Sequence, residues 1–414
     1  MDATHDPNDS DAQPTMPVRG GAQALDEQID RAYLVDKLSR LSQVPTSVPL
    51  GYETLMAPDD PKLVHYVQNV MRPALVEIGA YNLIDAGNNL VVQLGSGESG
   101  ESLLIQNYTV AQHYNLMEDP FSGKVTNGRA WGVDEPIVCG QGISQCKAHQ
   151  AVMLTVLKLL IERGVKLRGR LYWSINNEGR SSHACSEAVF QAIGETPSFG
   201  IIQLGTGLRL SLGNRGRVDV DVHVKGKATH SSAPQAGLSA IEGMHEVISR
   251  LRTLAWEDRH PILGGRHALV YKMRFEPVAP HTLPSDAFIV VDRRLIPGDD
   301  VDVATAEIRA VLEGMAPYEV TVERGVHMLP ALVDPTNPWV GALQAANVAV
   351  RGHEAEAFYG QGTFDAGGPC ALGTPTVMFG ATGGVYPTGI DFVPISAAET
   401  EARVLTRLIL DRLG

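Results

Sequence analysis

The sequence predicts an α/β protein with a smaller α+β domain inserted into it, and two observations carry this prediction. In both outer parts of the chain, apolar runs that suit buried strands alternate with helical patterns, which is typical of a largely parallel sheet. Between them, residues 217–325 follow the order β-α-β-β-α-β, the split ferredoxin-like unit. We therefore expect an α/β catalytic-type domain of residues 23–212 and 331–414, with residues 213–330 inserted as a lid.

The outer parts carry the elements of the α/β domain. Residues 23–43 and 61–78 have the apolar spacing of amphipathic helices, and Pro61 suits a first helical turn. Residues 145–165 are apolar over a wide face, which indicates a long and well-buried helix. The other elements that we expect here are strands at 89–95, 102–108, 169–175, 198–204 and 374–380 and helices at 186–194, 337–350 and 395–413.

The inserted segment differs from the outer parts of the chain in its hydrophobic pattern. Residues 217–226 alternate apolar and polar side chains with period two, which predicts a strand with one face toward solvent. The remaining elements that we expect are a helix at 239–255, strands at 267–277 and 286–295, a helix at 302–315 and a strand at 318–325.

The chain has 414 residues and a formal net charge of −13, which argues against a duplex nucleic-acid binder because such proteins need a basic surface. Seven acids and one base lie in residues 1–30, so nearly half of the excess negative charge sits at the N-terminus. We expect residues 1–22, which are polar and lack an apolar core region, to form a disordered acidic leader and not a secretory signal.

Neither a membrane segment nor a disulfide framework is predicted. No apolar run approaches the 18 or so residues that a membrane helix requires. Four cysteines in so long a chain do not form a disulfide framework. We expect a soluble cytoplasmic protein that binds neither nucleic acid nor membrane.

Polar residues that could do chemistry gather after the ends of the predicted strands, which is where α/β folds place their sites. Their motifs occur in one order along the chain, and each is quoted as it stands: DPFSG, GQGISQCK, NEG, VKGKATHSSAP, TLP followed by VVDRRL, and GTFDAGGPCALGTPTVMFG. Over residues 23–414 this order resembles the metallopeptidase family of aminoacylase, carboxypeptidase G and succinyl-diaminopimelate desuccinylase. The resemblance implies an amide-cleaving enzyme with two zinc ions and a homodimer formed through residues 213–330.

At the family's metal positions the sequence departs from this pattern. Tyr108 stands where the first zinc-binding His is expected, and Val110 replaces the Asp of the same element. The bridging Asp becomes Gln145, although Lys147 is retained, and the paired Glu-Glu becomes Asn177 and Glu178. Leu204 replaces a further acid, and the last His falls at Tyr386 or Pro387.

These replacements predict a degenerate zinc site. A zinc ion needs about three or four N, S or carboxylate ligands, for which an amide or a phenol is a poor substitute. Asn177 cannot accept a proton from water, so it cannot act as the general base. We expect no cofactor, and Tyr108, Gln145, Asn177 and Tyr386 become candidate substrate contacts.

The family's lid residues are better preserved. By resemblance, His230 matches the His that reaches the partner subunit's site and stabilises an oxyanion. Arg294 matches the Arg that holds a substrate carboxylate, although it could instead pair with Asp292 or Glu319. His281 stands where the family commonly has Asn, and we expect it to contact substrate.

A rebuilt metal site is an alternative that the sequence leaves open. His113, His149, Glu178 and His183 could hold zinc one turn away from the original position. In the plainer interpretation, His149 packs under the sheet and His183 caps a helix or faces solvent. Cys146, beside Lys147 at a helix start, is a weaker candidate nucleophile, because small buried cysteines are common.

The leading hypothesis is an amidohydrolase-like enzyme that acts on a C–N or adjacent bond of a small N-acylated or peptide-like carboxylate. His230 and Lys147 would stabilise an oxyanion, Glu178 or His113 would transfer protons, and Arg294 would anchor the carboxylate. Hydrolysis, acyl transfer, lyase and isomerase chemistry remain open. The alternatives are a conventional metallohydrolase with relocated ligands and an inactive ligand-binding homologue.

Overall fold

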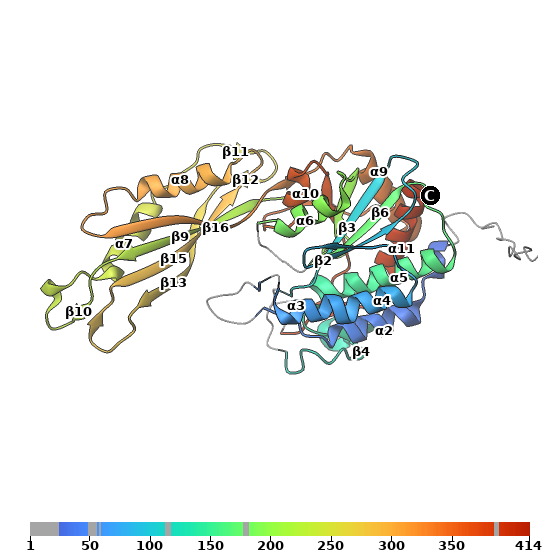
Figure 1. The fold of residues 1–414 in the computed structure, drawn as a ribbon, viewed down its shortest axis with the longest axis horizontal. Helices are drawn as coiled ribbons and strands as arrows, with labels where there is room; N and C mark the ends of the chain where they lie inside the picture. Colours follow the sequence, from blue (N-terminus) through green and yellow to red (C-terminus); the bar gives the residue numbers. More distant parts are fainter. Residues whose placement is uncertain (1–24, 49–55, 58, 112–116, 177–181, 385–388) are drawn as a thin grey trace, which may run out of the picture.

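Two layered bodies make up the protein, and they are joined at one edge of each (Figure 1). The computed structural model describes residues 25–48, 56–57, 59–111, 117–176, 182–384 and 389–414. The predicted leader, residues 1–22, lies outside these ranges. The larger body holds the main sheet and most of the helices. The smaller body, which we call the lid, holds a four-stranded sheet and two helices.

The main sheet follows the order β1-β2-β6-β3-β7-β19-β8-β17, and β18 also pairs with β8. At its centre β6, β3, β7 and β19 run parallel, whereas β1, β2 and β17 are antiparallel additions. The strands are β1 (Leu83–Ala86), β2 (Asn89–Leu94), β3 (Ser102–Tyr108), β6 (Arg170–Asn176), β7 (Phe199–Ile202), β8 (Leu210–Asn214), β17 (Ala331–Leu332), β18 (Ala357–Gly360) and β19 (Thr376–Met378). A small second sheet joins β4 (Val125–Asn127), β5 (Pro136–Cys139) and β20 (Phe392–Pro394).

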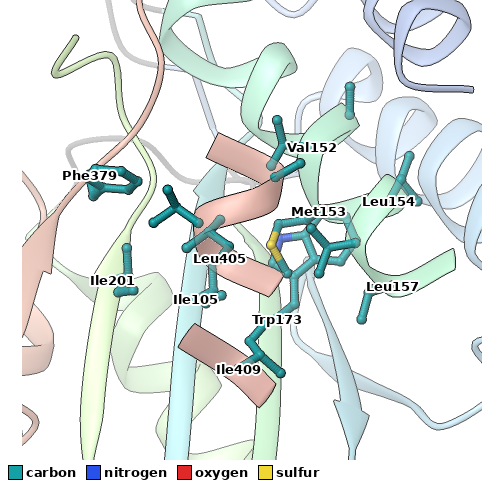
Figure 2. Packing of buried hydrophobic residues seen from close by; sticks show 14 of the residues in the cluster. Ile105, Val152, Met153, Leu154, Leu157, Trp173, Ile201, Phe379, Leu405 and Ile409 are labelled. Atoms are coloured by element: carbon teal, nitrogen blue, oxygen red, sulfur yellow. The ribbon is translucent and has the colours of Figure 1, made fainter. Parts of the chain in front are cut away.

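Helices cover both faces of the main sheet, so its central strands are buried on both sides. Figure 2 shows one face, where Val152, Met153 and Leu157 of α5 and Leu405 and Ile409 of α11 pack over the strands. On the other face α6 packs against β1 and β2. The helices of this body are α2 (Arg31–Ser42), α3 (Pro61–His65), α4 (Arg72–Glu77), α5 (Ala148–Glu162), α6 (Ala184–Ile193), α9 (Pro338–Arg351), α10 (Gly367–Ala371) and α11 (Ile395–Leu413).

Shorter helical turns complete this body, and two of them are π-helical. The turns are η1 (Asp26–Gln28), η2 (Tyr66–Met71), η3 (Gly128–Trp131) and η4 (Ile143–Lys147). The π-helical turn η2 interrupts the helix that we predicted at 61–78, and η4 forms the start of the one that we predicted at 145–165. π-Turns inside helices are often found at functional sites, and η4 carries Gln145 and Lys147.

A buried polar network ties the elements at the carboxyl edge of the main sheet. His149 Nδ1 lies 3.0 and 3.1 Å from the two carboxylate oxygens of Glu401, and Nε2 lies 3.2 Å from the Ser144 carbonyl oxygen. The same carboxylate accepts from Gln203 Nε2 (2.7 Å) and from the Ala381 amide (2.8 Å). Because both His149 and Glu401 are fully buried, one acid links α5, α11, the end of β7 and the loop after β19.

The lid sheet follows the order β13-β15-β9-β16, all antiparallel, with α7 and α8 on one face. Alternate valines of β9, Val218 to Val224, are buried under these helices, which confirms the period-two pattern. The lid elements are β9 (Gly216–Lys225), β10 (Thr229–His230), η5 (Pro234–Ala236), α7 (Ala240–Leu251), β11 (Arg259–His260), β12 (Gly264–Gly265), β13 (Ala268–Glu276), β14 (Thr282–Leu283), β15 (Asp286–Leu295), α8 (Val301–Val311) and β16 (Glu319–Met328).

Two very short strand-to-strand connections join the lid to the larger body. β8 of the main sheet passes through Arg215 into β9 of the lid, and β16 returns through Leu329 and Pro330 into β17. The two connections run side by side, since β17 pairs with β8 and β16 pairs with β9. The predicted fold class, an α/β body with an inserted ferredoxin-like lid, is confirmed. Among the helices that the structure describes, none is long and apolar enough to cross a membrane.

We predict that Glu401→Gln lowers the free energy of unfolding by about 3 kcal/mol, because the amide replaces a buried carboxylate and offers its NH₂ to groups that need an acceptor. The matched control is Glu399→Gln, two residues earlier on α11. Glu399 pairs with Arg31 at the surface, where side-chain exposures of 27% and 51% limit the loss to below ~1 kcal/mol. Chemical denaturation of both variants measures the difference. Equal losses would show that the buried network does not stabilise the fold.

Candidate functional site

The described residues at the positions where the family resemblance implies metal ligands lie at the carboxyl edge of the main sheet, as expected for an α/β fold. Tyr108 ends β3, and it pairs in register with Asn176, which ends β6. Gln145 lies on η4, and Leu204 follows β7. Of the other predicted site residues, His113, Asn177, Glu178 and Tyr386 lie outside the described residues.

An apolar cluster occupies this edge. Tyr108 and Leu204 both belong to it, and the other members are Cys146, Cys185, Ile202, Ala331, Phe364, Ala366, Cys370 and Met378. The Tyr108 ring is buried, and burial raises the pKa of its phenol well above the ordinary value, with the nearby Asp365 and Cys185 adding to the effect. The phenol therefore stays neutral at physiological pH.

Three buried polar atoms border this cluster and have no hydrogen-bond partner within the described ranges. They are Gln106 Oε1, Ser174 Oγ and Asn176 Oδ1. Gln106 and Asn176 otherwise make only long contacts, to Ser186 Oγ (3.5 Å) and Cys185 Sγ (3.6 Å). Because unsatisfied buried polar atoms are rare in native proteins, partners for this group come from ligand, from water or from residues outside the described ranges.

The described residues at the family positions do not fit a pair of zinc ions. Tyr108 offers a neutral phenol, Gln145 an amide and Leu204 no donor at all, whereas zinc takes thiolate, imidazole and carboxylate ligands. In the described part of the chain, no three His, Cys, Asp or Glu side chains are grouped closely enough to hold a metal.

His149 and His183, two of the four ligands of the predicted rebuilt metal site, are already bound elsewhere. His149 uses both ring nitrogens on Glu401 and Ser144, so it cannot serve as a ligand. His183 Nε2 accepts from the Leu329 amide at 2.8 Å. Burial, together with the nearby His327, lowers the pKa of His183 to about 4. His149 is thus a packed histidine under the sheet, as the plainer interpretation of the sequence expects.

Lys147 is sealed inside the protein, which does not support the predicted role in oxyanion stabilisation. Its ammonium donates to the Val44 carbonyl and lies 5.9 Å from the Tyr66 ring centroid and 5.7 Å from that of Phe121. The residue has no exposed surface, and burial lowers its pKa to about 8. Cys146 beside it is also fully buried, and its thiol contacts the Val110 carbonyl oxygen at 3.2 Å, so it does not present a nucleophile.

Asp391 and Glu401 hold the site together, and the sequence analysis missed both. The fully buried Asp391 carboxylate accepts from the amides of Gly142 (2.7 Å) and Ser144 (3.2 Å), which caps the start of η4. Burial raises the pKa of Asp391 to about 6. A signal for Glu401 exists in the sequence, because it stands among apolar residues of the closing helix, where an acid needs a buried partner.

The structure brings His230 and His281 together at the far tip of the lid. Their ring centroids lie 6.0 Å apart, and β10 pairs with β14 so that His230 faces Thr282 (Figure 1). The Ser232 amide donates to His230 Nδ1 at 3.2 Å, so Nε2 carries the proton of the neutral ring and can donate outward.

Arg294 lies at the other end of the lid, beside the larger body. It pairs with Asp292 (2.8 Å), the structural partner that the sequence left open, and it also donates to the Gln361 carbonyl oxygen (3.4 Å). Arg215 and Arg259 lie nearby, and neither has a carboxylate at ion-pair distance within the described ranges. Together with Arg294, burial lowers the pKa of Arg215. We call Arg215, Arg259 and Arg294 the arginine corner. It is positively charged and suits an anionic ligand.

The two ends of the lid are too far apart to act on one small molecule within one chain. β15 separates them, and the eight residue steps from Asp286 to Arg294 span roughly 26 Å at about 3.3 Å per residue. A site that uses His230 together with this chain's carboxyl edge therefore requires the lid of a second copy.

Comparison with known proteins agrees with this architecture. Residues 212–319 match the peptidase dimerisation domain of the M20 peptidases. Carboxypeptidase G2 of Pseudomonas sp. (strain RS-16) is 27% identical over 344 residues, which cover 78% of this chain and 77% of the relative. Acetylornithine deacetylase of Proteus mirabilis is 26% identical over 262 residues, which cover 60% of this chain and 64% of that relative. The resemblance to this peptidase family is confirmed.

Solved structures show the same fold. An M20 family metallo-carboxypeptidase from Sulfolobus solfataricus is similar with a TM-score of 0.72 at 16% identity, over 92% of this chain and 98% of that one. Human carnosine dipeptidase 1 has a TM-score of 0.71 at 11% identity, over 96% of this chain and 99% of that one.

We predict that Lys147→Met changes how stability depends on pH. Since the folded-state pKa of Lys147 is about 8 against an ordinary 10.5, the folded wild type gains stability as the pH rises from about 8 to about 10.5. This gain amounts to about 3 kcal/mol and is absent from the variant. Melting temperatures of both proteins between pH 7 and pH 10 measure it. If the melting temperatures of both proteins changed with pH in parallel, Lys147 would not have the lowered pKa. Lys124→Met, at an exposed position, is the control.

Proposed function

We propose that this protein is an enzyme of the amidohydrolase type that works without the family's zinc pair. Its substrate is a small N-acyl amino acid or peptide-like carboxylate, and the bond that reacts is the amide-type C–N bond or its neighbour. The observation that carries the proposal is the contrast between the two sides of the site. The lid carries His230 beside His281 at its tip and Arg294 at its junction with the larger body. At the positions where the family resemblance implies metal ligands, Tyr108 and Leu204 instead belong to an apolar cluster.

Substrate binding follows from the positive corner at the lid junction. Arg294 would anchor the carboxylate, because a guanidinium group forms charge-assisted hydrogen bonds with it. Arg215 adds positive charge beside it, and its guanidinium is held in place by a hydrogen bond to the Leu263 carbonyl (2.6 Å). The Gly360–Asp365 loop runs from Arg294 to Tyr108, since Gln361 contacts Arg294 and Asp365 lies beside the phenol. An anchored acyl chain would thus reach toward the carboxyl edge of the sheet.

The chemistry would come from protein groups. His230 of a second copy would present its Nε2 proton to the carbonyl oxygen as negative charge develops there, and His281 beside it would add a second imidazole. A water molecule would attack the carbonyl carbon, and Glu178 or His113 would take a proton from it and deliver a proton to the leaving nitrogen as the C–N bond breaks. Lys147 has no part in this scheme, because its ammonium is sealed against Val44. Zinc, if bound at all, would have to be held by a set other than the described family positions.

The experiment is turnover on a panel of N-acetyl amino acids and dipeptides, with and without a chelator, alongside elemental analysis of the purified protein. We expect turnover that the chelator does not change and zinc well below one ion per chain. Stoichiometric zinc together with chelator-sensitive turnover would overturn the metal-free part of the proposal and favour a conventional metallohydrolase.

A second function, a ligand-binding homologue without catalysis, is favoured by one observation. Near the positions where the family resemblance implies metal ligands, the described polar groups are neutral or make hydrogen bonds within the protein. His149, Lys147 and Cys146 are therefore unable to react. Saturable binding of an N-acyl amino acid by calorimetry, without turnover of any member of the panel, would support this function over the enzyme.

We also propose that the protein is a homodimer and that the lid, residues 213–330, provides its interface. β13 is an edge strand of the lid sheet and exposes four large apolar side chains. They are Leu269 (62% exposed), Tyr271 (44%), Met273 (53%) and Phe275 (39%). An exposed apolar edge strand is a template for pairing with a second copy.

We predict that Met273→Lys together with Leu269→Lys makes the protein monomeric in light scattering, because charges on both strands of such an interface repel each other. Turnover should fall at least tenfold with folding intact, since His230 would no longer reach a partner. Val278→Lys, which is 80% exposed but lies beyond the strand, is the control and should stay dimeric. A double variant that remains a dimer would exclude β13 as the interface.

A further inference from the structure

Two arginines that neighbour the arginine corner are neutralised by acids. The Arg266 guanidinium forms ion pairs with Asp258 and Asp299, each at 2.6 Å. The Arg293 guanidinium lies 2.9 Å from the Glu307 carboxylate. In these two cases a guanidinium group that stabilises the lid is matched by at least one carboxylate.

The arginine corner itself lacks this balance. Arg294 pairs with Asp292 at 2.8 Å, whereas Arg215 and Arg259 have no carboxylate at ion-pair distance among the described residues. Three guanidinium groups are thus matched by one carboxylate, which leaves an excess of two positive charges. Because like charges repel each other, such an excess is costly until an anion binds beside it.

The β11–β12 hairpin holds two of these guanidinium groups together. A Cβ atom added to Gly264 would lie 2.7 Å from Arg215 Nη2 and 3.7 Å from Arg259 Nη2, so both nitrogens lie beside the same glycine. The Arg215 guanidinium is fixed there because its Nε donates to the Leu263 carbonyl oxygen at 2.6 Å. Burial, together with the charges of Arg294 and Arg259, lowers the pKa of Arg215, as expected for positive groups at close range.

Arg294 brings the third guanidinium group close to this pair. β15 pairs with β9 so that Arg294 lies opposite Arg217, and Arg215 precedes Arg217 by two residues, which is the spacing of side chains on one face of a sheet. Such diagonal neighbours have Cβ atoms roughly 7 Å apart, a spacing that one small ligand can bridge. Arg294 Nε is buried and has no hydrogen-bond partner within the described ranges. The corner thus offers a buried donor as well as excess charge.

We propose that the arginine corner binds an oxyanion ligand that carries two negative charges. One anionic group lies at Arg294, and the second lies between Arg215 and Arg259, where planar guanidinium groups can bind its oxygens in pairs. Two sources share this chemistry, an N-acyl amino acid with a second carboxylate and a phosphate group. The inference deepens the proposed function and rests on it for the substrate carboxylate at Arg294. It adds that the substrate is a dianion.

The test is binding calorimetry on the full-length protein at constant ionic strength and about pH 8, where phosphate is a dianion. Two probes, the N-methanesulfonyl derivatives of aspartate and asparagine, are nearly equal in size and differ by one charge, and their sulfonamide bond resists hydrolysis. Inorganic phosphate is the third probe. The variant is Arg259→Gln, at an exposed position of the hairpin. The matched control is Arg163→Gln, which removes an exposed positive charge at the end of α5 in the larger body.

We expect the aspartate derivative to bind about tenfold more tightly than the asparagine derivative, or better, because its second carboxylate gains a charge-assisted hydrogen bond. Arg259→Gln should abolish this difference, and Arg163→Gln should keep it. If the second group is a phosphate, the two derivatives bind equally, and saturable binding of inorganic phosphate weakens about tenfold in Arg259→Gln alone.

Equal binding of the two derivatives without saturable phosphate binding would overturn the proposal. So would a preference for the aspartate derivative, or phosphate binding, that survives Arg259→Gln. If neither derivative binds, the proposed function fails at its substrate class, and phosphate alone then decides whether the corner is a dianion site. Because no turnover is measured, the outcome is separate from that of the chelator experiment.

Discussion

The buried contact between His149 and Glu401 is the interaction on which the candidate site depends most. Glu401 lies on the final helix, yet its carboxylate binds groups from α5, from the end of β7 and from the loop after β19. A buried carboxylate is costly unless its hydrogen bonds are made, so these segments must meet at one point. Asp391 acts in the same way at the start of η4. Together the two acids hold the carboxyl edge of the sheet.

The lid adds a geometric constraint to this arrangement. Its histidine tip and its arginine corner lie at opposite ends of β15, so one chain cannot bring both to the same small molecule. In the proposed homodimer, a second copy would solve this problem and would also cover the apolar edge of β13. The two connections between the bodies are short, and the return connection is held beside the larger body by hydrogen bonds to Ser182 and His183.

Much of the fold could be predicted from the sequence, because the hydrophobic period differs between strands and helices over long stretches. The alternating valines of β9 and the wide apolar face of residues 148–160 are examples. The site was harder to predict. Sequence motifs located Tyr108, Gln145 and Leu204 at the carboxyl edge, but they could not show that Lys147 turns away to Val44 or that His149 pairs with an acid 252 residues later.

The sequence by itself determined the fold class and the inserted lid, since residue type and hydrophobic pattern are local properties of the chain. The loss of metal ligands at the family positions is a prediction from the family resemblance. Only the tertiary structure decided which polar groups are available for chemistry. Burial and partners far away in sequence set that availability, as they do for Lys147, His149 and His183. The separation of His230 from Arg294 was likewise decided by the length of β15 between them, a distance that exists only once the lid sheet has formed.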